Sequence, residues 1–212
     1  MAVTLTTQNT VLGVLLPKEG SRRLLAQLAT VVLGTIALTV AAKIQVPVWP
    51  VHITLQSMVV ALLAGALGWR LGVATIALYL AEGLSGLPVF SAGGGIGYIF
   101  SPSFGFIVGW LPMAYIIGRF ADRGTSNRIL PLVLVMIAAD AVSFAFGFAW
   151  LMVVASMILQ SGGELPKWLA GGELVSVAWN GAVQPFILWD VLKMAFAAVT
   201  VAGAFSLLPK KA

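Results

Sequence analysis

Two oppositely charged side chains lie three residues apart in an apolar stretch near the C-terminal end of the sequence. Asp190 and Lys193 belong to a run that opens at Gln184-Pro185 and continues to about Leu208. Residues three apart project from the same face of a helix. Charged groups at membrane depth are costly, and they usually face a bundle interior, pair with each other or mark a ligand or ion path. The pair therefore either fixes packing or binds a polar ligand, with Asp190 accepting N–H groups and Lys193 donating to a carbonyl or carboxylate.

The charged pair must be positioned by other elements of the chain. The composition indicates that these elements are membrane helices. The chain has 212 residues, of which 60% are hydrophobic and 9% charged, and its mean hydropathy is +1.02. Soluble domains carry roughly 25% charged residues. The basic residues stand at the ends of apolar runs, which does not suggest nucleic-acid binding. The absence of cysteine and the single histidine, His52, exclude thiolate and imidazole metal sites, so we expect no metal and no cofactor.

Six apolar segments have lengths near the ~20 residues that span a bilayer. They cover about residues 24–42, 53–67, 71–87, 103–119, 129–159 and 184–208. We expect an all-α bundle of six transmembrane helices formed by residues 21–212, preceded by a flexible tail of residues 1–20. Of the twelve lysines and arginines, nine fall on the side of both termini, two fall opposite and Lys193 lies within a span. This bias places both termini in the cytoplasm.

Three irregular segments then share the outer side of the membrane. Residues 44–52 contain two prolines, residues 88–101 contain a glycine run, and residues 160–172 are polar and glycine-rich. Irregular backbone near membrane depth is tolerated where it lines a cavity or is buried in protein. Asp190 lies about six residues into the last span, or ~9 Å from its outer end. The sequence therefore predicts a ligand pocket beneath these segments.

Further candidate ligand-binding residues lie in or beside the irregular segments. Thr54 and Gln56 begin the second span; an amide offers donors and acceptors together, which suits an amide-like or urea-like ligand, although Thr54 can equally cap the helix. Gly95 lies in the glycine run, where backbone can approach a ligand, and Tyr98 adds a hydroxyl group. Trp189 either walls a pocket beside the charged pair or anchors its helix at the interface.

Two further acids lie inside predicted spans. Glu82 either faces the same pocket or reaches the interface, and Asp140 lies about eleven residues into the fifth span. Asp140 and Asp190 are comparable in depth, as the two acids of an intramembrane aspartyl protease would be. A lysine three residues from Asp190 disfavours a shared-proton dyad, and the glycine and tyrosine context typical of such proteases is missing. We therefore predict no catalytic residues and no enzyme activity.

Several stretches together resemble one known family. Residues 43–56, K-I-Q-V-P-V-W-P-V-H-I-T-L-Q, are similar to the K-I-x-(I/V)-P-x-x-P-V-P-(I/F)-T-x-Q signature of the BioY family, the biotin-specific S components of energy-coupling-factor (ECF) transporters. Residues 79–97, 101–109 and 185–193 resemble further motifs of that family in the same order. The chain departs from the pattern at His52 and at Leu188-Trp189, and it lacks the asparagine and arginine that some members carry within residues 90–109.

The resemblance implies six helices, biotin capture on the outer face of a prokaryotic plasma membrane, and coupling to a transmembrane T component with ATP-binding A subunits. It carries Asp190 and Lys193 over to ligand-binding positions. It also implies docking of the T component on small residues of the first helix. Ala37 and Ala41 suit that docking, although their spacing serves packing inside the bundle equally well. Two rival functions stay open: an S component for another amide-bearing vitamin, and a stand-alone ion-coupled vitamin transporter.

Overall fold

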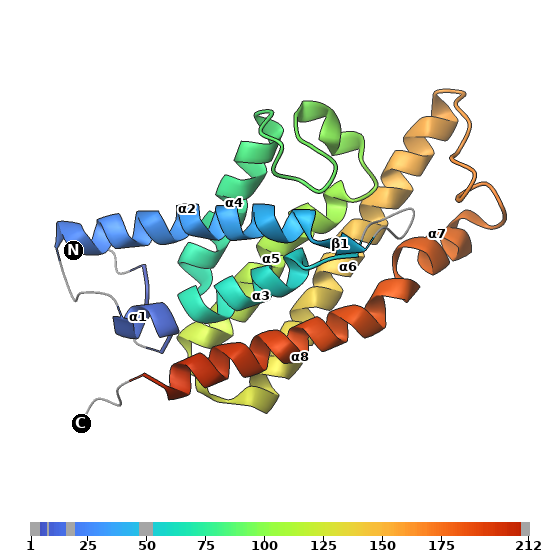
Figure 1. Ribbon diagram of the computed structural model, residues 1–212. Coiled ribbons are helices and arrows are strands. Elements are labelled where there is room, and N and C mark those ends of the chain that lie inside the picture. The colour runs from blue at the N-terminus through green and yellow to red at the C-terminus, as the bar shows by residue number, and fades with distance from the viewer. Residues whose placement is uncertain (1–4, 8, 16–19, 47–52, 209–212) are drawn as a thin grey trace.

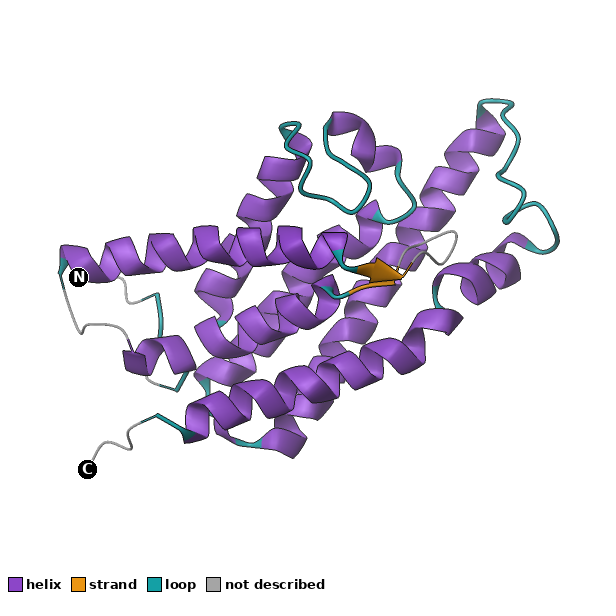
Figure 2. Cartoon of the chain, viewed as in Figure 1, coloured by secondary structure: helices purple, strands orange, loops and turns teal. Residues whose placement is uncertain are grey.

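The computed structural model describes residues 5–7, 9–15, 20–46 and 53–208, and helices dominate this part of the chain (Figure 2). One short antiparallel hairpin is present, in which Gln45 pairs with Thr54 and Val46 with Ile53. The elements follow in the order α1 (Val11–Leu15), α2 (Ser21–Lys43), β1 (Gln45–Val46), β2 (Ile53–Thr54), α3 (Gln56–Leu67), α4 (Trp69–Leu84), η1 (Ile96–Phe100), α5 (Phe104–Asp122), η2 (Thr125–Asn127), α6 (Ile129–Gln160), α7 (Leu174–Ala182) and α8 (Gln184–Ser206).

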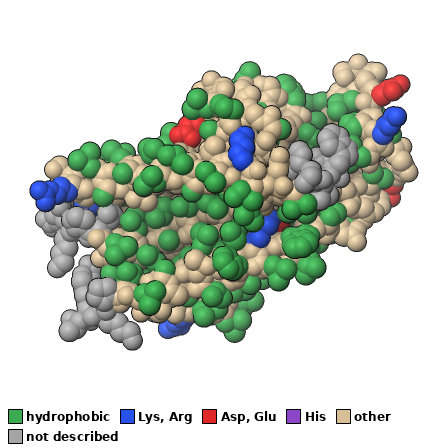
Figure 3. All heavy atoms as spheres, in the orientation of Figure 1, with side chains coloured by type: hydrophobic (Ala, Val, Ile, Leu, Met, Phe, Trp, Pro, Cys, Tyr) green, Lys and Arg blue, Asp and Glu red, His purple; other side chains and the backbone are tan. Residues whose placement is uncertain are grey.

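Four helical segments of the described chain are long and apolar enough to cross a membrane: α2, α5, α6, and α7 with α8 taken together. The other two predicted spans correspond to α3 and α4, which have 12 and 16 residues. Large apolar side chains on α2 and α8 point outward, including Leu25, Leu33, Leu188 and Phe196, and hydrophobic side chains cover this face (Figure 3). Such a surface suits lipid, because lipid chains do not penalise exposed apolar groups as water does.

The irregular segments gather at one end of the bundle. The β1–β2 hairpin, the loop from 85 to 103 and the loop from 161 to 173 lie toward that end, whereas α1 and the C-terminal end of α8 lie at the opposite end (Figure 1). This grouping is the one that the predicted helix order required. Residues 47–52, including His52 and both prolines of the first irregular segment, lie outside the described residues. The short helix α7 lies between the loop from 161 to 173 and α8.

Glycines allow the tight helix contacts that frame the bundle. A Cβ on Gly109 of α5 would lie 2.8 Å from Ser143 Cα on α6, and one on Gly105 would lie 2.2 Å from Trp150 Cβ. The four-residue spacing of Gly105 and Gly109 is the one that permits close helix contact. The two helices therefore approach closely at these glycines, where a larger residue would collide with the neighbouring helix.

The turn between α3 and α4 is stabilised by the carboxylate of Asp122. Gly68 joins the two helices at a φ of +83°, a conformation that glycine adopts without strain. Asp122 Oδ2 accepts the Trp69 backbone N–H at 3.3 Å, and its Oδ1 accepts the Thr7 hydroxyl at 3.0 Å. Part of the predicted flexible tail thus contacts the bundle: Thr7 binds Asp122, and residues 11–15 form α1.

The core lies between α3, α4, α5, α6 and α8. Its largest fully buried side chains include Tyr79, Met113, Leu132, Met136 and Met194. Each fully buried apolar side chain of this size contributes roughly 1.5–3 kcal/mol relative to exposure to water. A cavity lies toward the end of the bundle where the irregular segments gather, and it is the candidate site.

Candidate functional site

The charged pair forms an ion pair within one turn of α8. Lys193 Nζ lies 2.9 Å from Asp190 Oδ1, and their side chains are 11% and 7% exposed. Ser57 of α3 completes the group: its hydroxyl donates to Asp190 Oδ1 at 2.5 Å, and Lys193 Nζ lies 3.4 Å from Ser57 Oγ. Buried charges must be paired and hydrogen-bonded to be tolerated. The packing function considered for this pair is therefore present, but the pair also faces a cavity.

That cavity has a volume of about 330 Å³, within the ~300–1,000 Å³ typical of small-molecule sites. Two of the irregular segments contribute to it, through six residues between 91 and 103 and through Pro166 and Trp168, and Thr54 of the β1–β2 hairpin adjoins them. The helices supply the rest of the wall: Gln56, Ser57, Phe106, Ile107, Trp110, Asp140, Ser143, Phe144, Ala182, Phe186, Asp190 and Lys193. The structure thus brings residues from distant parts of the chain to one chamber beneath the loops.

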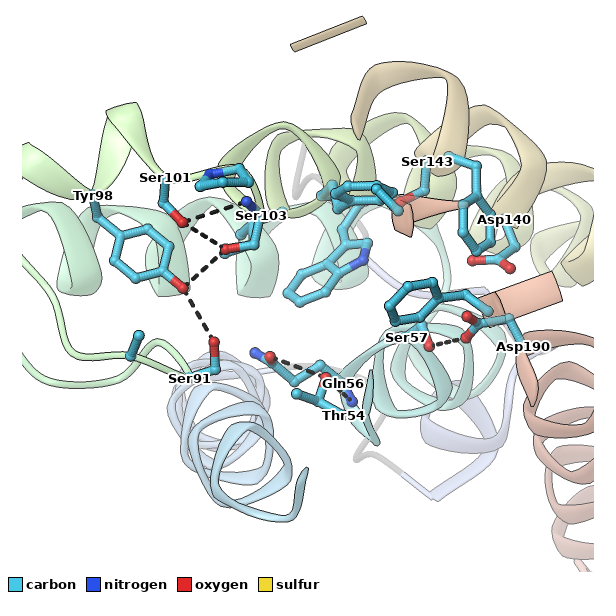
Figure 4. A pocket seen from close by; sticks show the side chains of 18 of the residues that line it. Thr54, Gln56, Ser57, Ser91, Tyr98, Ser101, Ser103, Asp140, Ser143 and Asp190 are labelled. Carbon is cyan, nitrogen blue, oxygen red and sulfur yellow. Dashed lines mark hydrogen bonds between the residues drawn. The ribbon is translucent and has the colours of Figure 1, made fainter. Parts of the chain in front are cut away.

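Four hydroxyl groups converge at one end of the cavity (Figure 4). Tyr98 OH lies 3.1 Å from both Ser91 Oγ and Ser103 Oγ, and Ser101 Oγ lies 2.9 Å from Ser103 Oγ. We call Ser91, Tyr98, Ser101 and Ser103 the hydroxyl end. Tyr98 was predicted as a site residue; the three serines were not. The S-P-S sequence of residues 101–103 was the available signal, since it sets two hydroxyls just before a membrane helix.

The opposite end of the cavity holds carboxyl groups (Figure 4). We call Ser57, Asp140, Asp190 and Lys193 the acidic end. Asp140, on α6, is 6% exposed and lies within electrostatic range of both Asp190 and Lys193. Within the described residues, no cluster of three or more metal-ligating side chains is present. The acidic end therefore offers hydrogen-bond acceptors and one ammonium group to whatever occupies the cavity.

Thr54 and Gln56 lie along the cavity wall between the two ends. The Gln56 amide donates to Tyr79 OH at 2.7 Å, and Tyr79 OH in turn donates to the Val89 carbonyl at 2.8 Å. The Thr54 hydroxyl lies 3.3 Å from Gln56 Oε1 and accepts the Gln56 backbone N–H at 3.3 Å. The N-cap residue of α3 is Leu55, so Thr54 is not the cap of this helix; its hydroxyl lies one residue earlier and lines the cavity. Tyr79, which orients the amide, was not predicted as a site residue.

Aromatic side chains make the middle of the chamber apolar. Phe106 and Trp110 come from α5, Phe144 from α6, Phe186 from α8 and Trp168 from the loop before α7. A ring system with polar groups at its two extremities would meet flat apolar walls here and hydrogen-bonding groups at each end.

Three predicted positions do not join the cavity. Trp189 is 53% exposed on the outside of α8, so its prediction as a pocket wall is wrong. Successive residues of a helix point about 100° apart, so Trp189 points away from the cavity although its neighbour Asp190 lines it. Gly95 has a φ of +102°, and its N–H donates to the Gly83 carbonyl at 2.7 Å. This N–H group therefore stabilises the loop and is not free to bind a ligand. Glu82 accepts a hydrogen bond from Thr35 at 3.1 Å and also lies outside the cavity lining.

The two alanines proposed for docking differ in burial, although they lie one turn apart on α2. Ala41 is 3% exposed and packs inside the bundle, whereas Ala37 is exposed. The packing alternative therefore applies to Ala41, and a flat surface made of both alanines is excluded in this conformation.

Taken together, these features define a class of protein: a helical membrane protein that encloses a small-molecule cavity with polar groups at both ends. The BioY family model matches residues 8–210, and the chain belongs to the BioY family. A biotin transporter BioY of Rhodobacter capsulatus is 40% identical over 169 residues, which cover 76% of this chain and 85% of that protein. A probable biotin transporter BioY of Lysinibacillus sphaericus is 35% identical over 121 residues.

The relatives are transporters and not enzymes. The match to the Lysinibacillus protein covers 57% of this chain and 62% of that relative's length. A crystal structure described as the S-component for biotin from an ECF-type ABC transporter has the same fold, with a TM-score of 0.71 over 89% of this chain and 95% of the other. Its sequence identity is 23%, so this likeness concerns the fold.

Proposed function

We propose that this protein is the membrane subunit that captures biotin for uptake. The observation that carries the proposal is the cavity itself: an ion pair at one end, four hydroxyls at the other and aromatic walls between them, in a member of the BioY family. Biotin has a cyclic urea, an apolar thioether ring and a valerate tail with a terminal carboxylate. These three parts match the acidic end, the aromatic middle and the hydroxyl end in order.

Charge decides the orientation of the ligand within this proposal. The biotin carboxylate would be repelled by Asp140 and Asp190 at the acidic end, where a single ammonium group is already bound to Asp190. At the hydroxyl end it meets donors and no carboxylate. The urea N–H groups need acceptors, which the acidic end supplies. Tyr98 and its neighbouring serines thereby take the place of the asparagine and arginine that some members of the family carry within residues 90–109, where this chain has neither.

Membrane insertion and energy coupling complete the proposal. Helices α2, α3, α4, α5, α6 and α8 are the six spans of a prokaryotic plasma-membrane protein, with both termini cytoplasmic and the cavity open to the outside. The sequence contains no Walker motif, so ATP hydrolysis must come from A subunits that act through a T component. The outward apolar face of α2, which includes Ala37, is available for that contact.

Biotin binding to the purified protein in detergent, measured by calorimetry, tests this function. The unaltered protein is expected to bind biotin, and Asp190→Asn and Lys193→Met are each expected to weaken binding at least tenfold. An unaltered protein that fails to bind biotin would refute the function. Unchanged affinity in both variants would refute the site while leaving the ligand in place.

One observation favours a second candidate, an ion-coupled transporter that works alone. Asp140 is buried, lines the cavity and has no hydrogen-bond or ion-pair partner among the described residues, as an ion- or proton-binding carboxyl group would be. Uptake of biotin in cells that lack every ECF coupling subunit separates the two functions. Accumulation that collapses when the proton gradient is removed would support the second candidate; uptake that appears only with T and A subunits supports the first.

A further inference from the structure

Asp140 is the buried acid whose hydrogen-bonding capacity the protein does not use. It is 6% exposed, and it has no hydrogen bond or ion pair with any residue that the structure describes. Asp190, which is 5% exposed, instead holds both Ser57 and Lys193. No fully buried side-chain oxygen or nitrogen of the described residues lacks a hydrogen-bond partner. The Asp140 oxygens, which have no partner, are therefore accessible and are not sealed in the core. The Asp140 carboxyl group lies at the acidic end of the ligand cavity (Figure 4).

The side chains around Asp140 are committed elsewhere or are apolar. Ser143, one turn along α6, donates to the Phe106 carbonyl at 3.2 Å. Lys193 directs its ammonium group to Asp190 and Ser57. Phe144 and Phe186, which line the same cavity, carry no donor. Asp140 also lines a second hollow, whose other lining residues are apolar or aromatic. A hydrogen-bond donor for Asp140 is therefore supplied by what occupies the space beside it, and the ligand cavity is part of that space.

We propose that Asp140 is a ligand-binding residue that accepts one of the two N–H groups of a cyclic urea, while Asp190 accepts the other. This inference rests on the proposed function and assigns a second acceptor to the same site. A cyclic urea carries two N–H donors that diverge on either side of one carbonyl, so a single carboxyl group on one wall cannot face both. Asp140 on α6 and Asp190 on α8 supply acceptors from two different helices.

The remaining atoms of the acidic end suit this arrangement. Ser57 and Lys193 both bind Oδ1 of Asp190, which leaves Oδ2 without a bond to the described residues. An ammonium group has three donors, and Lys193 has two neighbours at this site, so one donor faces the urea carbonyl. The site then recognises a ligand by two donors and one acceptor in a fixed order. A lactam or an open amide with a single N–H would leave one carboxyl group unsatisfied and would be rejected.

Variants and ligand analogues together test the assignment. We would measure the affinity of the unaltered protein and of Asp140→Asn for biotin and for two biotins that are each methylated at one urea nitrogen. The matched control is Glu82→Gln, which removes an acid from a membrane helix outside the cavity. Asp140→Asn is expected to weaken biotin binding by about 10- to 100-fold, the loss typical of a hydrogen bond to a charged group. Glu82→Gln is expected to change it less than twofold.

The analogues identify the contact itself. For the biotin methylated at the nitrogen that faces Asp140, the variant and the unaltered protein should bind with affinities within about threefold, because the lost bond is the same. For the other analogue, the variant should retain its full loss. Unchanged biotin affinity in Asp140→Asn, or equal losses for all three ligands, would overturn the inference. If Asp140→Asn does not fold, the affinities of the unaltered protein for the three ligands test the inference. Both methylated biotins must then bind at least tenfold more weakly than biotin, and a methylated biotin that binds as well as biotin would overturn the inference.

The outcome separates this inference from the function on which it rests. An unaltered protein that binds no biotin refutes both. An unaltered protein that binds biotin, with an Asp140→Asn variant that binds equally well, refutes only the assignment of Asp140.

Discussion

The two ends of the cavity hold their polar groups in different ways. At the acidic end, Asp190 and Lys193 come from one turn of one helix, and their charges are buried. At the hydroxyl end, uncharged groups come from a loop and from the residues just before α5, and they hold one another in place. A charged end loses much when one partner is removed, because the other is left buried and unpaired. A neutral end loses about one hydrogen bond at a time.

This difference predicts that the two ends of the cavity contribute unequally to the affinity for the ligand. The acidic end should account for most of the affinity, and the hydroxyl end should contribute less, through hydrogen bonds to the end of the ligand tail. Four substitutions test this prediction, and we take them in order of expected effect.

Asp190→Ala should have the largest effect. It leaves the Lys193 ammonium buried with Ser57 as its remaining partner, and we expect biotin affinity to fall by about 100-fold or more. Titration calorimetry in detergent measures the loss. The double variant Asp190→Ala with Lys193→Met removes both charges and should melt at a higher temperature than Asp190→Ala alone. A single variant with near-normal affinity would contradict the comparison, since the charged end would then contribute no more than the neutral one.

Tyr98→Phe should have the next largest effect, and one that depends on the ligand tail. The phenol contacts two serines at the hydroxyl end, and its loss should weaken biotin binding by about tenfold if the carboxylate lies there. Biotinamide, which has no negative charge, should lose less than threefold in the same variant. Asp190→Asn is the matched control, because it should weaken both ligands equally. The reverse pattern would place the carboxylate at the acidic end.

Ser57→Ala should have a smaller effect. Its hydroxyl supports Asp190 without carrying charge, so we expect biotin affinity to fall by about three- to tenfold. A loss as large as that of Asp190→Ala would show that the serine itself holds the ligand. The same calorimetric titration distinguishes these results.

Trp189→Ala should have the smallest effect. Its ring is 53% exposed on the outer surface of α8, one residue from the charged pair, and we expect biotin affinity to change less than twofold. Intrinsic fluorescence and thermal melting would confirm that the variant is folded. A large loss would show that this ring turns inward when ligand binds.

The sequence predicted the parts of the site that depend on local geometry. Asp190 and Lys193 could be paired from their spacing alone, because helix periodicity places them on one face. Ser57 and Ser91 could not be assigned, since only the packing of α3 against α8 and the folding of the loop before α5 show where they point. The error at Trp189 has the same origin: proximity along the chain was taken for proximity in space.

The fold was predicted in a similar way. The long apolar helices and the grouping of the irregular segments follow from hydropathy and helix order, and both are present. The helix in residues 11–15 and its attachment through Thr7 to Asp122 depend on a contact across more than 100 residues. No local pattern in the sequence marks such a contact.

The hydroxyl end has a property that a charged cluster lacks. In each of its three hydroxyl–hydroxyl contacts, either oxygen can be the donor. The hydrogens can therefore rotate so that the whole chain of bonds reverses direction while every heavy atom stays where it is. One proton order directs a hydrogen at the occupant, and the opposite order directs a lone pair. The same four side chains can thus meet an anionic or an amide terminus, and the protein carries this versatility without any movement of its backbone.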